Sequence, residues 1–299
     1  MQLSGLLDLV IIGLFRGGLY ALMALGLALV FGVMNIAQFA HGEFYMVGAY
    51  VAFFGAAVLG VHPLLAWVMA LVCVFAVGVL VERTVFLPLR LRSHEGWVMN
   101  AFLLTVGVSF VIQNVALAWL GPSYRGITEY WKGGFSITAG LNVSADRVAS
   151  FVAVIVTIVA LWLFLHRTRI GRAIRAVAQD ERGATLVGIN LSRIHVLTFG
   201  LSTALAGLAG AVLLPMTQAY PSVGFKPMVL SWYVVMLVGM GSISGAVVGG
   251  FIIGILESFS YYYLGGGWQD VVVLAILILI LLFKPSGLFG AEVKGIWER

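Results

Sequence analysis

Residues 147–193 decide the fold: RVASFVAVIVTIVALWLFL is followed directly by HRTRIGRAIRAVAQDERGATLVGINLSR. The first part is apolar over the roughly 20 residues that a helix needs to cross a bilayer. The second part, residues 166–193, carries Asp180 and Glu181 against six arginines, which are Arg167, Arg169, Arg172, Arg175, Arg182 and Arg193. Because cytoplasmic loops of membrane proteins are enriched in Lys and Arg, this segment is predicted to be cytoplasmic.

The composition of the whole chain agrees with a membrane protein. Of its 299 residues, 62% are apolar and 10% are charged, and the mean hydropathy is +1.07. A soluble domain would carry about 25% charged residues. The composition therefore excludes a soluble enzyme and a disordered chain. The net charge of +5 is concentrated in one loop, so it indicates membrane topology rather than a nucleic-acid partner.

Apolar runs predict helices along most of the chain. We expect a single permease domain over residues 1–299, of the all-α polytopic class, with about eight or nine transmembrane or half-spanning helices. The expected helices lie at about 6–31, 43–60, 63–81, 97–120, 147–165, 192–214, 228–240, 246–263 and 268–283. The segment 228–240 is short and is a candidate half-helix.

Counting outward from 166–193 assigns a side to each loop. The loop with Arg83, Arg90 and Arg92 is expected inside, and so is the tail with Lys284 and Lys294. The loop 121–146, with its mixed charges and aromatic residues, is expected outside as an interfacial cap. The tail agrees only if residues 228–263 cross twice, which requires a break in the glycine-rich run 239–250.

Polar residues within the apolar regions mark a candidate substrate pathway, because hydrocarbon offers them no partner. Asn35, Gln38 and His41 are spaced i, i+3 and i+6, so they would share one broad face of a helix. The remaining candidates are Glu43, Gly241, Ser242, Gly245 and Glu257. A simpler interpretation also stands: residues 35–43 could form an interfacial turn, with Glu43 favoured by the helix dipole, and the glycines could permit close packing.

Arg16 and Glu257 are the two charges that hydropathy places well inside spans. They could pair with each other or with a partner subunit, or Glu257 could carry a proton. No catalytic motif occurs in the sequence, and Cys73 is its only cysteine, so we expect no enzymatic activity and no metal site built on cysteine.

The cytoplasmic segment is amphipathic at helical spacing. Ile170, Ile174 and Val177 are expected on one face, and Arg172, Arg175, Gln179 and Arg182 on the other. Such a helix, held between two spans, either lies on anionic lipid or docks into a groove on a soluble partner.

Several motifs, taken in order, resemble one family over nearly the whole chain. The chain is similar to LivH-type permease subunits of ATP-binding-cassette importers for branched-chain and other hydrophobic amino acids. The matching pieces are GLYALMALG at 18–26, FAHGE at 39–43, PLR at 88–90, RIGRAIRAVA at 169–178, LVGIN at 186–190, Thr198 with Phe199, ALAGLAG at 204–210, GSISGA at 241–246 and KPSGLFG at 284–290.

The resemblance implies the partners and the location. These are a second homologous permease, two cytoplasmic ATPases, an external substrate-binding protein and the lipid of the bacterial cytoplasmic (inner) membrane. It also implies that ATP and Mg are bound by the ATPases, so that this chain holds no cofactor. The coupling residues that it implies are Arg169, Gly171, Arg172, Arg175, Ala184 and Gly188.

Departures from the family pattern leave alternatives open. Gln38 stands where Asn is usual, and relatives also move urea and short amides. Arg182 and Gly183 replace the usual Glu and Ala of the coupling loop, so a salt bridge from that Glu is not expected. The hypothesis is an amino-acid importer permease. The alternatives are a permease for urea or short amides, a proton-coupled secondary transporter using Glu43 or Glu257, and a passive channel.

Overall fold

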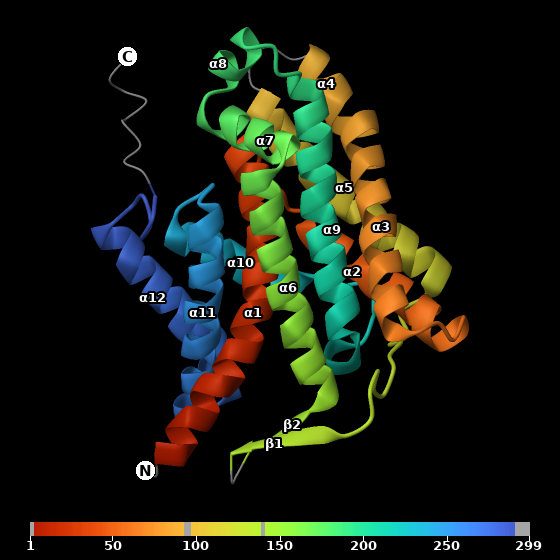
Figure 1. Ribbon diagram of the computed structural model, residues 1–299, viewed down its shortest axis with the longest axis vertical. Coiled ribbons are helices and arrows are strands. Elements are labelled where there is room, and N and C mark those ends of the chain that lie inside the picture. Colours follow the sequence, from red (N-terminus) through yellow and green to blue (C-terminus); the bar gives the residue numbers. More distant parts are fainter. Residues whose placement is uncertain (1–2, 93–96, 139–140, 291–299) are drawn as a thin grey trace.

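The computed structural model describes residues 3–92, 97–138 and 141–290, and it is helical almost throughout (Figure 1). Lys294 of the expected inner tail lies outside the described residues. The helices are α1 Leu3–Met34, α2 His41–Phe53, α3 Pro63–Val81, α4 Leu87–Arg92, α5 Trp97–Leu120, α6 Ala145–Arg167, α7 Arg169–Gln179, α8 Glu181–Leu186, α9 Leu191–Thr217, α10 Phe225–Val238, α11 Ile243–Leu264 and α12 Gln269–Phe283. The π-helical segments Phe54–Val58 and Glu82–Phe86 extend α2 and α3, and a 3₁₀ turn, Gly266–Trp268, precedes α12.

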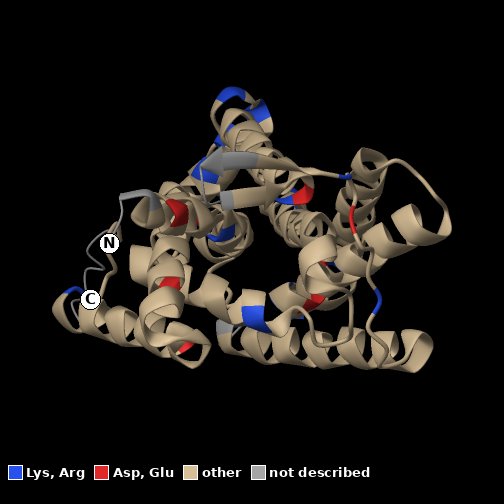
Figure 2. Ribbon diagram, turned by 90° about the horizontal axis from the view of Figure 1, so that it is seen from below, with Lys and Arg blue, Asp and Glu red and all other residues tan. Residues whose placement is uncertain are grey.

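Within the described residues, seven helical segments are long and apolar enough to cross a membrane, and α10 is a shorter apolar helix. The polytopic all-α prediction is confirmed. In the view from below in Figure 2, most of the ribbon is uncharged, as burial in lipid requires.

The long helices α1 and α9 form the centre of the bundle and are mostly buried. Glycines allow α1 to pack closely on α11: a Cβ on Gly17 or on Gly254 would overlap the backbone of the facing helix. Small residues are the usual means of close helix approach in membranes. Gly245 and Gly249 instead face Val238 of α10.

The two ends of the bundle agree with the predicted topology. Figure 1 places α7 and α8 at one end together with the last described residues, and the N-terminus at the other end. The chain turns at Gly239 and Gly241, which have φ of 99° and 87°, so the predicted break in the glycine-rich run 239–250 is present and separates α10 from α11; that both cross the membrane stays a prediction. Only glycine adopts such positive φ angles without strain.

Two long helices end in the same way. Asn35 after α1 and Gln218 after α9 have φ of 53° and 57°, and they are the non-glycine residues with positive φ in the described part of the chain. After each of these two residues, the chain turns back into the bundle before the shorter helices α2 and α10 begin. Gly42 at the start of α2 and Gly224 just before α10 pack backbone to backbone, leaving no room for a Cβ on either. Helices α2 and α10 therefore start beside one another inside the bundle.

The 121–146 loop contains a hairpin that the all-α prediction missed. Strand β1, Gly134–Thr138, pairs antiparallel with β2, Leu141–Ser144. The loop is held to the bundle by Asp146, whose Oδ1 accepts hydrogen bonds from the backbone N–H groups of Tyr130 (2.9 Å) and Trp131 (3.0 Å). Both aromatic rings pack against Trp67 of α3. Such an aromatic layer is typical of a membrane interface.

Candidate functional site: a cavity in the outer half

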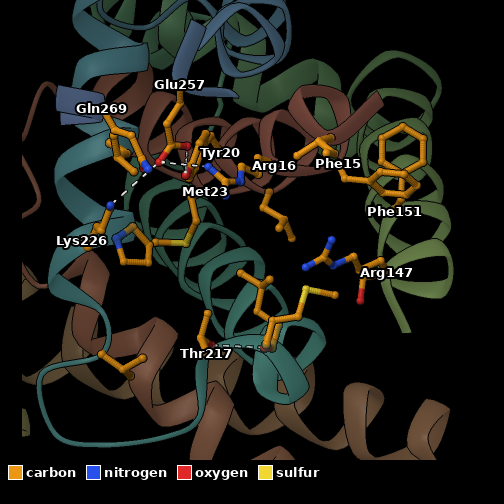
Figure 3. A pocket seen from close by; sticks show the side chains of 18 of the residues that line it. Phe15, Arg16, Tyr20, Met23, Arg147, Phe151, Thr217, Lys226, Glu257 and Gln269 are labelled. Atoms are coloured by element: carbon orange, nitrogen blue, oxygen red, sulfur yellow. Dashed lines mark hydrogen bonds and ion pairs between the residues drawn. The ribbon is translucent and has the colours of Figure 1, made fainter. Parts of the chain in front are cut away.

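A cavity of about 470 Å³ lies among α1, α6, α9, α10 and α11, near the end of the bundle that carries the hairpin (Figure 3). This is within the range of small-molecule sites. Its apolar wall comes from several helices and consists of Ile12, Phe15, Leu19, Met23, Val143, Phe151, Leu213, Met216, Val223, Pro227 and Leu230. The cavity thus offers a largely apolar surface to a bound molecule.

A buried carboxylate sits at one side of the cavity. The Glu257 side chain is 2% exposed, and its Oε2 accepts a hydrogen bond of 2.5 Å from the Tyr20 hydroxyl. Its Oε1 lies 3.8 Å from Nη1 of Arg16 and 3.9 Å from Nζ of Lys226. A carboxylate removed from water needs such partners, because an unpaired buried charge costs several kcal/mol. The pairing of Arg16 with Glu257 is one of the arrangements expected from the sequence.

The ionic groups that line the cavity do not balance. Arg16, Arg147 and Lys226 are cations, and Glu257 is the carboxylate among the described lining residues. The cavity therefore favours an anionic group on its ligand. An apolar wall combined with excess positive charge suits a molecule that joins a carboxylate to a hydrophobic side chain.

Of the eight residues predicted for the pathway, Glu257 lines the cavity. His41 lies directly behind Met23, since its Nε2 is 3.0 Å from the Met23 carbonyl oxygen, and it is fully buried. Gln38 is also buried, and its amide has no hydrogen-bond partner. Glu43 accepts a hydrogen bond of 2.9 Å from Ser109 of α5. Gln38, His41 and Glu43 thus lie near the start of α2 rather than at the cavity surface.

The other predicted pathway residues form turns. Asn35 follows the end of α1. The hydroxyl of Ser242 accepts the Gly245 N–H (3.2 Å) at the start of α11, and Gly241 packs against Gly32 of α1. The structure does not bring these residues to the cavity.

Sequence reasoning missed Arg147, Lys226 and Tyr20. Arg147 and Lys226 had not been singled out, and Tyr20 appeared only as part of a motif. A signal was available, because Arg147 and Lys226 are basic residues at helix ends that the predicted topology places outside, against the usual bias of positive charge toward the inside.

The predicted coupling segment, residues 166–193, is a second polar site, at the end of the bundle opposite to the hairpin. The Thr168 hydroxyl accepts the Gly171 N–H (2.9 Å) at the start of α7, and Asp180 accepts the Arg182 N–H (3.0 Å) at the start of α8. Both are N-caps, which satisfy backbone donors that a helix leaves unpaired. Local capping thus explains why two short helices form here.

The buried face of α7 differs by one residue from the prediction. Gly171, Ile174 and Val177 are buried, whereas Ile170, which shares the face of Ile174 and Val177, is 44% exposed at the start of the helix. The cause is the crossing of α7 over α6, where a Cβ on Gly171 would overlap the backbone of Phe164 and Leu165. The residue at the closest approach of α7 to α6 is therefore a glycine, which has no side chain.

The predicted coupling residues divide into surface and packing positions. Arg169 and Arg172 are exposed, while Arg175 donates to the Leu165 carbonyl oxygen (3.1 Å) and Ala184 is buried. Gly188 follows the end of α8 with φ of 85°. Next to it, Leu186 and Val187 are 89% and 77% exposed. These two apolar side chains had not been selected from the sequence.

Residues 9–281 match the model of the family described as branched-chain amino acid transport system / permease component. The chain belongs to this family. The permease protein BraD of Pseudomonas aeruginosa is 35% identical, covering 93% of this chain and 94% of the relative. The permease protein LivH of Escherichia coli is 34% identical, covering 93% of each. The ribose import permease protein RbsC of Escherichia coli is 28% identical over 54% of this chain and 56% of its own length.

Membership of the branched-chain amino acid permease family confirms the main prediction from the sequence. The chain is a transport permease of the kind found in ATP-binding-cassette importers, not an enzyme of a soluble class. With its apolar helices, it is a multi-pass protein of the bacterial inner membrane. Permeases of such importers work together with ATPase and binding-protein partners.

Proposed function

We propose that this chain is the membrane-spanning permease subunit of an importer that translocates branched-chain or other hydrophobic amino acids, and that the outer cavity receives the amino acid. The observation that carries the proposal is the combination of an apolar wall with an excess of cations in one cavity. Moving a zwitterion into an apolar region without compensating groups would be prohibitive. The cavity supplies both a hydrophobic surface and charged partners.

The lining charges favour amino acids over urea or short amides. The zwitterion of an amino acid has no net charge, but its carboxylate can pair with a lining cation, which a neutral amide cannot do. The partial likeness to a ribose permease is consistent with a scaffold that carries different substrates, so specificity belongs to the cavity rather than to the fold.

The partners follow from the two ends of the molecule. Two cytoplasmic ATPases, which bind ATP and Mg, dock on the exposed side chains of α7 and α8, namely Arg169, Arg172, Arg182, Leu186 and Val187. An external binding protein delivers substrate at the hairpin end, and a second, related permease completes the membrane part. This chain itself holds no cofactor in the proposal, and no group of metal-ligating side chains occurs in its described part.

The environment of Glu257 argues against its use as a proton carrier in a secondary transporter. Both oxygens of its carboxylate are engaged within this chain, by Tyr20 on one side and by Arg16 and Lys226 on the other, so the residue already has a structural role.

Reconstitution in liposomes tests the proposal. The chain, the second permease, both ATPases and the binding protein should give leucine uptake that requires ATP and varies little with the pH gradient, and excess urea should not compete. The chain alone should give no flux of leucine or urea. Uptake driven by a proton gradient without ATP, or urea flux through the chain alone, would overturn the proposal.

A further inference from the structure

We propose that Arg147 binds the carboxylate of the transported amino acid in the outer cavity. This assignment rests on the proposed function, and it adds a specificity-determining residue that the sequence had not marked. The assignment follows from the ionic partners of the lining cations, from the anchoring of Arg147 and from the face of α6 on which it lies.

The other two cations of the cavity already have anionic partners. Arg16 lies beside Glu257 and over the ring of Tyr261, with its guanidinium carbon 5.7 Å from the ring centroid. Lys226 lies between Glu257 and Asp270, with its Nζ 3.5 Å from Oδ1 of Asp270. Arg147 makes no ion pair with any residue that the structure describes. Among the described residues, Arg147 is therefore the lining cation without an anionic partner, and its exposed side chain can be reached by a ligand.

The backbone of Arg147 is held in place by the outer loop. Arg147 is in the first turn of α6, and the preceding residue, Asp146, accepts two backbone N–H groups of the loop, those of Tyr130 and Trp131. The Tyr130 hydroxyl in turn donates to the Ala211 carbonyl oxygen in α9 (2.8 Å). These contacts fix the backbone from which the exposed Arg147 side chain extends into the cavity.

One face of α6 presents three different groups to the cavity. Arg147, Ser150 and Phe151 all line it, because residues three and four apart share a helix face. Figure 3 shows the Arg147 side chain extending into the cavity, the Arg16 side chain directed to Glu257, and Phe151 beside Phe15. An amino acid whose carboxylate binds Arg147 would therefore place its side chain against the aromatic wall. This arrangement suits the hydrophobic side chain of a branched-chain amino acid.

Arginine is suited to this role because its planar guanidinium donates two parallel hydrogen bonds to a carboxylate. Hydrogen bonds to charged groups are worth about 1.5–3 kcal/mol, which corresponds to a loss of affinity of roughly ten-fold or more when the donor is removed. The loss should depend on the carboxylate of the ligand.

The test measures binding to the purified permease–ATPase complex without the binding protein, so that the cavity alone is examined. A leucine analogue with a photoreactive side chain labels the complex, and leucine or leucinamide competes. In Arg147→Gln, leucine should compete roughly ten-fold or more weakly, while leucinamide, which lacks the carboxylate, should change little. Arg147→Lys should recover part of the affinity for leucine. Lys132→Gln, an exposed cation in the same outer loop that does not line the cavity, should behave as the unchanged chain.

The results that would contradict the inference can be told apart from one another. Equal losses for leucine and leucinamide would mean that Arg147 only supports the wall, and unchanged competition by leucine would mean that the carboxylate binds elsewhere; either overturns the inference. Labelling outside the cavity, with ATP-driven uptake intact, would overturn the inference and leave the importer function standing. If Arg147→Gln fails to assemble, the lysine variant decides by the same comparison of the two competitors.

Discussion

At the scale of single residues, the cavity depends on how the Glu257 carboxyl group is held inside the bundle. Tyr20 donates a short hydrogen bond to one carboxylate oxygen, and two cations lie near the other. The cations are partly exposed, so water screens their contribution. The buried hydroxyl is therefore the partner whose removal should be felt most.

Tyr20→Phe tests this point, since it removes the hydroxyl and keeps the ring. We expect a loss of about 1–3 kcal/mol in stability, because a buried charged acceptor loses its donor. Thermal unfolding of the purified chain in detergent measures the change. Tyr124→Phe is the matched control, as that ring is exposed and stacks on Tyr220. Equal melting temperatures for the two variants would contradict the assigned role of Tyr20.

At the scale of elements, the coupling segment is built by the crossing of α7 over α6. Gly171→Ala should force the two helices apart, because the added Cβ meets backbone rather than a flexible side chain. Overpacking of this kind costs about 1–3 kcal/mol. Gly5→Ala near the start of α1 adds the same methyl group in open space and should be neutral. Limited proteolysis of α7 and thermal unfolding measure the effect. Equal protease sensitivity and equal melting temperatures of the two variants would contradict the prediction.

The surface arginines of the segment make a different prediction. Arg172→Glu should abolish co-purification with the ATPases and leave the melting temperature unchanged, because Arg172 is exposed and has no described partner. Arg175→Glu should also lower the melting temperature, since Arg175 donates to the Leu165 carbonyl oxygen. Arg83→Glu, an exposed cation near the end of α3, is the control. Normal co-purification of Arg172→Glu would count against docking at α7.

At the scale of the whole molecule, α5 stands apart from the other peripheral helices. Its exposed positions include Asn100, Gly107 and Asn114, seven residues apart and therefore on one face. The exposed side chains of α3, and those of α12 after Asp270, are mostly apolar, as in Val68 and Ile278. Lipid offers an amide no hydrogen-bond partner, and helices of membrane assemblies meet through small and amide-bearing residues. We therefore expect the second permease to cover this face of α5.

Cysteine cross-linking tests this arrangement. In a Cys73→Ala background, Gly107→Cys should form a cross-link to a cysteine placed on the second permease, whereas Val68→Cys on the lipid-facing side of α3 should not. Mass spectrometry of the product identifies the partner helix. Cross-links from position 68 together with none from position 107 would assign the interface to the other side of the bundle.

The amino-acid sequence by itself determined the membrane class, the approximate extents of the long helices and the family, and it predicts the side of each loop. Hydropathy and arginine content act over short stretches of chain, so they can be read without knowing what packs against what. The coupling segment, with its two N-caps, is likewise determined by its own short stretch of sequence. The tertiary structure alone decided that Asn35 and Gln218 turn the chain back into the bundle, that Gly171 rather than Ile170 faces α6, and that Arg147 and Lys226 share a cavity with Glu257. Each of these depends on side chains or backbone brought together from helices far apart in the sequence, and no local pattern records such a meeting.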